Sequence, residues 1–305
     1  MINITEKNKM GIIGSNGFVG SHLTEILNPT NKFENINVLD LKENIFDGID
    51  VLVYLVKGNR GVIVNGLENT LQKALRSGVK KIIYLSTIAV FGNIIDEGIN
   101  DGSPLLKNQI QEYQSSKVEA EEIVNKFRKK GLNIIILRPG YVYGENGIEH
   151  TINFFRLLED GFYPPENGRG ILNAIYVKNL CHIIKLAIDS NIKNEDFNAV
   201  DGFEITCKDL FDGYKKILNK KLKKRRKFII VRNNLISKIV SRIKKFIFPE
   251  RILISYIDYF WYLCRYQIPA HKLENLLKYK PIYSFDEAMN NINHWYKNIY
   301  LNRNV

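Results

Sequence analysis

Short runs of consecutive apolar residues recur through the first half of the chain, and longer amphipathic segments separate them. Strands of this kind are typical of a parallel sheet that helices cover on both faces. We expect strands at residues 10–13, 36–40, 51–56, 81–86 and 134–138, and helices at 19–27, 67–77 and 113–129. The pattern predicts an α/β fold with a doubly wound, Rossmann-type parallel sheet.

The alternation becomes less regular after Gly144. We expect helices at 148–158, 180–188 and 209–218, and short strands at 174–177 and 197–200. The interpretation is an NAD(P)-binding domain at 1–145 and a smaller, mostly helical substrate lobe at 146–305, with part of 171–200 returning to the sheet domain.

A glycine-rich segment, GSNGFVG, follows the first expected strand and opens the first expected helix. Glycines there allow a tight turn and a close approach of a pyrophosphate, and the helix N-terminus favours the negative charge. Three glycines alone are weak evidence, but the strand before them and the helix after them strengthen it. The sequence predicts a dinucleotide site that includes Gly14, Asn16, Gly17, Phe18, Val19 and Gly20.

Tyr113 and Lys117 lie four residues apart, on one face of an expected helix. A free tyrosine has a pKa of about 10, and nearby positive charge lowers it. Such a tyrosine can exchange a proton with an alcohol while hydride moves to or from a nicotinamide. Thr87, at the carboxyl end of a strand, would hydrogen bond to the reacting oxygen. The alternative, a surface tyrosine beside a solvated lysine, is disfavoured by Thr87 and the glycine turn.

Several segments together resemble the extended short-chain dehydrogenase/reductase superfamily and its NAD-dependent epimerase/dehydratase family. They are the glycine spacing, STIAVFG at 86–92, YQSSK at 113–117, RPGYVYG at 138–144, and a closing segment with Lys272, 277–281 and Trp295. The resemblance covers almost the whole chain. It implies catalysis by Tyr113, Lys117 and Thr87. It also implies cofactor contacts from Ser86, Tyr113, Lys117 and Pro139, and substrate contacts from Thr87, Ile88, Tyr141 and Arg169.

Asp40 ends an expected strand about 20 residues beyond the third glycine. A carboxylate there can bind both hydroxyls of an adenosine ribose, which favours NAD over NADP as the cofactor. In the alternative interpretation, 38–41 is a later strand of the family pattern, whose aspartate faces the adenine.

The substrate side departs from the resemblance. Tyr141 stands where many relatives that use nucleotide sugars carry asparagine, and an arginine that is common in them falls on Leu172, although Arg169 is close. Val177-Lys178-Asn179 replaces the usual VDD. Sugar 4,6-dehydratases carry an Asp-Glu pair after the threonine, whereas Ile88 and Ala89 cannot transfer protons. The sequence therefore argues against dehydration.

Residues 208–251 hold 16 Lys/Arg and three Asp/Glu, which accounts for the formal net charge of +12. A helix expected at 235–247 has an apolar stripe and basic residues off it, and an aromatic-rich segment follows at 252–263. We expect peripheral membrane contact through 220–265 within the basic segment 208–265. The alternative is that the stripe packs on the sheet domain. No nucleic-acid-binding module is recognised, so nucleic acid is not expected as a partner.

The three cysteines, Cys181, Cys207 and Cys264, are far apart, which suits a reducing compartment. The five histidines lack metal-ligand spacing, so no metal is expected. No apolar run approaches the roughly 20 residues of a membrane span, and the N-terminus shows no signal region. We expect a cytoplasmic protein, peripheral at the inner face of the membrane.

Together these features predict an NAD(P)-dependent epimerase or ketoreductase that acts on a nucleotide- or lipid-diphosphate-linked sugar in surface polysaccharide biosynthesis. The first alternative is an oxidoreductase of a hydrophobic alcohol, similar to the 3β-hydroxysteroid dehydrogenases. The second is a cofactor-binding scaffold or sensor without turnover. A homodimer is implied by the resemblance alone.

Overall fold

The computed structural model describes residues 9–33, 36–92, 98–107, 109, 111–220, 222–224, 228–231, 252–255 and 264–303. Its main sheet has six strands in the order β2-β1-β3-β4-β5-β8, and every neighbouring pair is parallel. The strands are β1 (Met10–Ile13), β2 (Asn31–Phe33), β3 (Val51–Tyr54), β4 (Lys81–Leu85), β5 (Ile134–Pro139) and β8 (Asp196–Ala199). The predicted parallel α/β sheet is confirmed.

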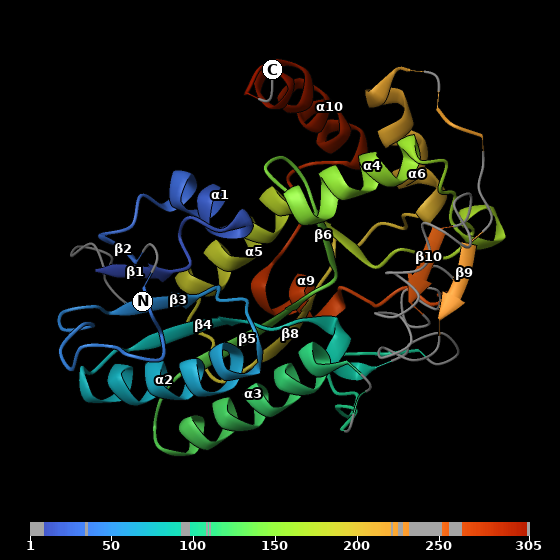
Figure 1. The fold of residues 1–305 in the computed structure, drawn as a ribbon. Helices are drawn as coiled ribbons and strands as arrows, with labels where there is room; N and C mark the ends of the chain where they lie inside the picture. Colours follow the sequence, from blue (N-terminus) through green and yellow to red (C-terminus); the bar gives the residue numbers. More distant parts are fainter. Residues whose placement is uncertain are drawn as a thin grey trace.

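Helices cover both faces of this sheet (Figure 1). On one face lie α2 (Gly66–Arg76) and α3 (Glu112–Lys129), and on the other lie α1 (Phe18–Leu27), α5 (Val177–Asp189) and α9 (His271–Leu277). Because successive strand residues point to opposite faces, Ile82 packs with α2 and α3 while Ile83 packs with α5. This explains why the strands are apolar throughout.

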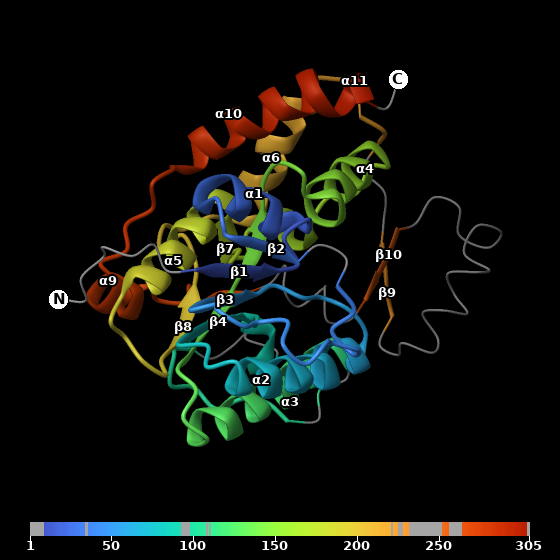
Figure 2. The ribbon, with the colours of Figure 1, turned by 90° about the vertical axis from the view of Figure 1, so that its left-hand side faces the viewer.

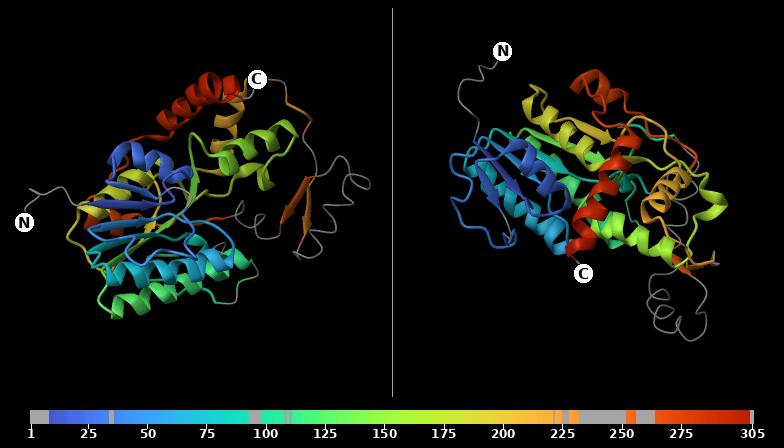
Figure 3. Two further views of the ribbon diagram at one scale, coloured as in Figure 1. Left: turned by 60° about the vertical axis from the view of Figure 1, so that its left-hand side comes forward. Right: turned by 90° about the horizontal axis from the view of Figure 1, so that it is seen from above.

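The second lobe contains a small parallel pair and a helical group with an aromatic core. It comprises β6 (Tyr141–Tyr143), β7 (Ala174–Tyr176), η3 (Ile148–Ile152), α4 (Asn153–Glu159), α6 (Cys207–Leu218), α10 (Phe285–Trp295), η5 (Tyr296–Tyr300) and α11 (Leu301–Arg303). The Phe155 ring meets the rings of Tyr214 and Tyr296 edge to face, with centroid distances of 4.9 and 4.7 Å. Seen from above, α10 crosses between the sheet domain and α4 (Figure 3).

A second parallel pair, β9 (Phe228–Val231) and β10 (Ile252–Ser255), stands apart from the main sheet (Figure 2). The aromatic-rich segment at 252–263 therefore begins as a strand. The helix expected at 235–247 lies outside the described residues. Within the described part of the chain, no helix has the length and apolar character needed to span a membrane.

The prediction of a strand at 36–40 is wrong. The strand beside β1 is Asn31–Phe33, a polar segment at the edge of the sheet, where one side of the strand needs no apolar partner. Residues 38–40 form a turn, because the Asn37 side chain accepts a hydrogen bond from the Leu39 amide at 3.1 Å and its carbonyl accepts one from the Asp40 amide at 3.0 Å. Asparagine favours such turns over a strand.

Asn179 attaches the second lobe to the start of α5. Its contacts explain why asparagine stands here in place of the last aspartate of the usual VDD. Its buried amide group makes four hydrogen bonds: Nδ2 donates to Asp201 and the Tyr283 carbonyl, and Oδ1 accepts from the amides of Ile282 and Tyr283. Burial raises the pKa of the Asp201 carboxyl to about 7. Asparagine at this position thus joins α5 to the segment that precedes α10.

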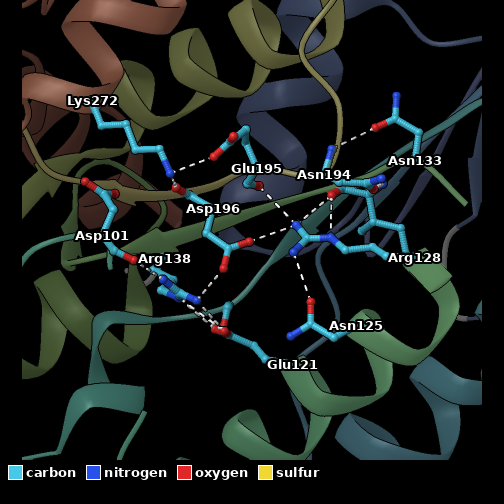
Figure 4. Close-up of polar contacts among 12 residues, drawn as sticks. Asp101, Glu121, Asn125, Arg128, Asn133, Arg138, Asn194, Glu195, Asp196 and Lys272 are labelled. Atoms are coloured by element: carbon cyan, nitrogen blue, oxygen red, sulfur yellow. Dashed lines mark hydrogen bonds and ion pairs between the residues drawn. The ribbon is translucent and has the colours of Figure 1, made fainter. Parts of the chain in front are cut away.

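A buried polar cluster joins α3 to β5 and β8 (Figure 4). The Arg138 guanidinium on β5 donates to both carboxylate oxygens of Glu121 on α3, at 2.6 to 3.2 Å, and to Asp196 Oδ2 on β8 at 2.8 Å. The side chains of Arg138 and Glu121 are 4% and 1% exposed. Paired in this way, the charges remain satisfied although they are out of water.

We predict that Glu121→Gln lowers the free energy of unfolding by about 3 kcal/mol, because Arg138 then loses its closest counter-charge in a buried position. Glu122→Gln is the matched control. Its carboxylate is exposed and pairs with Lys107, so we expect a change within about 0.5 kcal/mol. Urea titration measures both, and equal losses in the two variants would contradict the prediction.

Candidate active site

The glycine turn connects β1 to α1, and its backbone is tightly packed. Gly14 has a φ of +84°, which favours glycine, and its carbonyl accepts a hydrogen bond from the Gly17 amide at 3.1 Å. A Cβ on Gly20 would lie 2.0 Å from the Gly14 carbonyl oxygen. The first turn of α1 therefore lies directly against the end of β1, as predicted from the glycine spacing.

These residues fit the diphosphate of a dinucleotide. The first turn of α1 contains no acidic side chain, so the positive end of its dipole is not neutralised there. The Ser15 hydroxyl in the glycine turn is buried and has no hydrogen-bond partner among the described residues, which leaves a donor for a bound group. Asn16 is exposed beside it, and Phe18 and Val19 are half-buried in the first turn of the helix.

Lys117 and Thr87 lie at the carboxyl end of β4, and Tyr113 is one helical turn before Lys117 on α3. Lys117 is buried on α3, and its Nζ donates to the Leu85 carbonyl at 2.9 Å. Two residues farther along, the half-buried Thr87 caps the short helix η2 (Ile88–Phe91), and its Oγ1 accepts from the Ala89 amide at 3.2 Å. The Thr87 hydroxyl hydrogen remains able to donate. Tyr113 is half-buried one turn before Lys117.

Burial favours the neutral forms of both Tyr113 and Lys117. Burial and the nearby Glu149 carboxylate raise the pKa of Tyr113 to about 12. Burial lowers the pKa of the Lys117 ammonium to about 8, and the charge of Lys57 contributes. The expectation that the lysine beside it lowers the Tyr113 pKa does not hold for the protein alone. Positive charge from a bound group is needed to favour the phenolate.

Three further predicted residues are buried at the same end of the sheet. The Ser86 hydroxyl donates to Glu121 Oε1 at 2.6 Å, so it belongs to the Arg138 cluster. Pro139 is the last residue of β5, and its side chain is buried. Ile88 is 3% exposed and packs in a core cluster with Val118 and Ile268. For Ser86 and Ile88, the main chain is the part best able to contact a ligand.

Two predicted substrate residues, Tyr141 and Arg169, lie on the side of the second lobe. The Tyr141 hydroxyl donates to the His150 carbonyl at 3.0 Å, and its ring packs on the His150 ring. Arg169 is exposed beside Ile171, which pairs with Thr206. Asp40 is exposed in the turn beyond β2 rather than at the end of a strand. The binding roles of all three stay predictions.

The sequence analysis missed Lys57, Glu149 and His150. Lys57 follows β3 and forms an ion pair with Glu149 on η3. The ring of His150 lies 6.2 Å from the ring of Phe18 in the glycine turn. The position of Lys57 just beyond the carboxyl end of a strand was the available signal, since ligands of such sheets bind at that edge. The described residues contain no group of three side chains suited to holding a metal ion.

The family model of the 3-beta hydroxysteroid dehydrogenase/isomerase family matches residues 48–225, more than half of the chain. The chain belongs to this family. The matched range contains Thr87, Tyr113 and Lys117, and the resemblance to the extended short-chain dehydrogenase/reductase superfamily is confirmed.

Similar curated proteins include sugar epimerases. The chain is 25% identical over 243 residues to N-acetyl-alpha-D-glucosaminyl-diphospho-ditrans,octacis-undecaprenol 4-epimerase of Escherichia coli O157:H7, which covers 69% of this chain and 72% of that protein. It is 28% identical over 162 residues to UDP-glucose 4-epimerase of Vibrio cholerae, covering 50% of this chain and 47% of that protein.

Solved structures with the same fold include the dTDP-glucose 4,6-dehydratase of Streptomyces venezuelae with NAD bound. That structure has a TM-score of 0.73 at 20% identity and covers 95% of this chain and 97% of that chain. The UDP-glucuronic acid 4-epimerase of Bacillus cereus, in complex with NAD, has a TM-score of 0.72 at 17% identity over 95% of this chain and 99% of that chain. At these identities the likeness shows the fold.

The titration of Lys117 gives a prediction about stability. In the folded protein its pKa is lowered from 10.5 to about 8 by burial, so between these pH values the unfolded chain binds a proton that the folded chain does not. Stability from this group therefore rises with pH across that window. We compare the free energy of unfolding of the wild-type protein with that of its Lys117→Met variant. The difference should rise by up to about 3 kcal/mol from pH 8 to 10.5.

Urea titrations across that pH range measure the difference. Lys126→Met, on the exposed side of the same helix, controls for the loss of a lysine. A difference between wild type and Lys117→Met that stays constant with pH would contradict the prediction.

Proposed function

We propose that this protein is an NAD(P)-dependent epimerase or ketoreductase that acts on a sugar linked to a nucleotide or lipid diphosphate, in the synthesis of a surface polysaccharide. One observation carries the proposal: Lys117 is fixed to the end of β4 beside Thr87, one helical turn from Tyr113, at the sheet edge that also holds the glycine turn. This arrangement suits proton transfer at an alcohol next to a bound nicotinamide.

The glycine turn, Ser15 and the first turn of α1 would hold the dinucleotide diphosphate, and NAD is favoured as the cofactor by its presence in the similar solved structures. The nicotinamide supplies hydride transfer. Tyr113 accepts or donates the proton of the substrate hydroxyl, Thr87 orients that oxygen by a hydrogen bond, and Lys117 holds ribose hydroxyls. The positive charge of a bound oxidised nicotinamide would favour the Tyr113 phenolate.

The substrate assignment is supported by the likeness to the undecaprenol-diphosphate-sugar and UDP-glucose 4-epimerases. Dehydration is disfavoured because Ile88 and Ala89 follow Thr87, and neither side chain can exchange a proton. In an epimerase the hydride returns to the other face of the same sugar. In a ketoreductase a reduced cofactor arrives from solution.

The second candidate is an oxidoreductase of a hydrophobic alcohol, which the matching family model favours by its name. Assays of the purified protein with a 3β-hydroxysteroid and with UDP-linked sugars separate the two. Turnover of the steroid alone would replace the first proposal.

Peripheral membrane contact and a homodimer are proposed as well. The run of lysines and arginines from Lys220 to Lys227, followed by the β9 segment FIIV, combines charges that attract anionic lipids with apolar residues. Such contact would suit a lipid-linked substrate. Light scattering of the protein as it elutes from a size-exclusion column measures its molar mass and so tests the dimer.

The cofactor and the role of Tyr113 are tested together. We expect NAD⁺ or NADH to be released when the purified protein is denatured, if it is an epimerase that recycles its own hydride. Tyr113→Phe should bind NAD⁺ like wild type but lose kcat by about 100-fold or more, because the proton acceptor is gone. Wild-type protein that binds neither NAD⁺ nor NADP⁺ would contradict the proposed function. An unchanged kcat in the variant would support the scaffold alternative.

Membrane contact predicts co-sedimentation with vesicles that contain phosphatidylglycerol and little with pure phosphatidylcholine. Replacing Arg225 and Arg226 with glutamine should weaken the binding by roughly 30-fold, because each basic residue near an anionic surface contributes about 1 kcal/mol. Lys129→Gln with Lys130→Gln, at the exposed end of α3, is the control. Equal binding to both vesicle types would contradict the proposal.

A further inference from the structure

The loop after β3 lies directly against the glycine turn. The Leu55 amide donates to the Ile13 carbonyl at 3.1 Å, and a Cβ on Gly14 would lie 3.4 Å from the Leu55 carbonyl carbon. Lys57 is two residues farther along this loop. Its ammonium group is therefore on the side of the sheet where the diphosphate of a dinucleotide would lie.

The same loop also contacts the first turns of α3. The Arg60 amide donates to Glu112 Oε1 at 3.3 Å, and the Arg60 guanidinium makes two hydrogen bonds to Glu119, at 2.7 and 2.8 Å. Glu112 precedes Tyr113 in the chain. Lys57 thus lies on a segment that is anchored at the glycine turn on one side and next to the catalytic tyrosine on the other.

Lys57 is held by a partner from the other lobe. Its Nζ forms an ion pair with Glu149 on η3, and the two side chains are 57% and 65% exposed. An ion pair this exposed contributes only about 0–1 kcal/mol to stability. An anion that enters between the lobes can therefore displace Glu149 at little cost.

A diphosphate bound on the substrate side would need a positively charged side chain. The arginine that relatives use on the substrate side falls on Leu172, a half-buried apolar residue that packs against the second lobe's core, and Arg169 is exposed. Burial lowers the pKa of both Lys117 and His150, and the charge of Lys57 contributes to both shifts. A lysine ammonium binds phosphate oxygens as a point charge.

We propose that Lys57 binds a diphosphate group between the two lobes, and that Glu149 is its counter-ion only while no diphosphate is there. The inference rests on the proposed function, since that function supplies the diphosphate. Two sources share this chemistry: the pyrophosphate of the cofactor, and the diphosphate of the substrate. The alternative is that the ion pair only holds the lobes together.

Calorimetric titrations of the full-length protein distinguish these cases. The probes are NAD⁺, and inorganic pyrophosphate added to protein that is saturated with NAD⁺. Lys57→Gln should weaken one of them by about 10-fold or more, as expected for the loss of a hydrogen bond from a charged group. Glu149→Gln should leave that affinity unchanged or raise it, because Lys57 is then free of its counter-ion.

Lys185→Gln is the matched control. Lys185 also forms an exposed ion pair, with Asp189 on α5, and should have no effect on either titration. Weaker NAD⁺ binding in Lys57→Gln assigns the lysine to the cofactor, and weaker pyrophosphate binding assigns it to the substrate.

Two results would overturn the inference. One is normal binding of both probes by Lys57→Gln. The other is an equal loss in Lys57→Gln and Glu149→Gln, which would mean that the ion pair only braces the lobes. In both cases NAD⁺ still binds the wild-type protein, so the proposed function stands. Wild-type protein that does not bind NAD⁺ would instead remove the proposed function, and the inference with it.

Discussion

The buried guanidinium of Arg138 holds α3 against the sheet, and the candidate active site depends on it. Glu121 and Lys117 lie one turn apart on α3, so the ion pair that fixes Glu121 also fixes the helix face that carries Lys117 and Tyr113. Asp196 brings β8 into the same cluster. Because a buried charge without a partner is costly, the cluster permits one position of α3 relative to β5 and β8.

The order of the strands then determines where a ligand can enter. The chain runs from β1 outward to β2 and then crosses to β3 on the other side of β1. The loops after β1 and β3 therefore diverge at the carboxyl edge, which is where ligands bind in sheets of this kind. The glycine turn and the loop that carries Lys57 both lie at this edge. Thr87 follows the next strand, so binding and proton transfer share one edge.

The second lobe is attached by buried polar groups rather than by apolar surface alone. Asn179, with Asp201, ties α5 to the segment before α10, and Tyr176 donates to Glu145 while it accepts from Asn291 on α10. The aromatic rings of α4, α6 and η5 fill the space behind these contacts. The lobe is therefore firmly joined to the sheet domain at its core, whereas at the site it is joined by the exposed pair of Lys57 and Glu149.

The sequence by itself determined the parallel sheet, the glycine turn and the pair of Tyr113 and Lys117. Each depends on local periodicity or spacing: β1 has the predicted bounds, and α3 begins one residue earlier than predicted. Only the tertiary structure decided that 36–40 is a turn, that Ile88 is in the core, that Ser86 bonds to Glu121, and that Lys57 meets Glu149. The strand failed because a short turn hydrogen bond at Asn37 outweighed an apolar pattern. The contacts could not be foreseen because their partners lie far apart in sequence, 35 residues for Ser86 and 92 for Lys57, and packing alone brings them together.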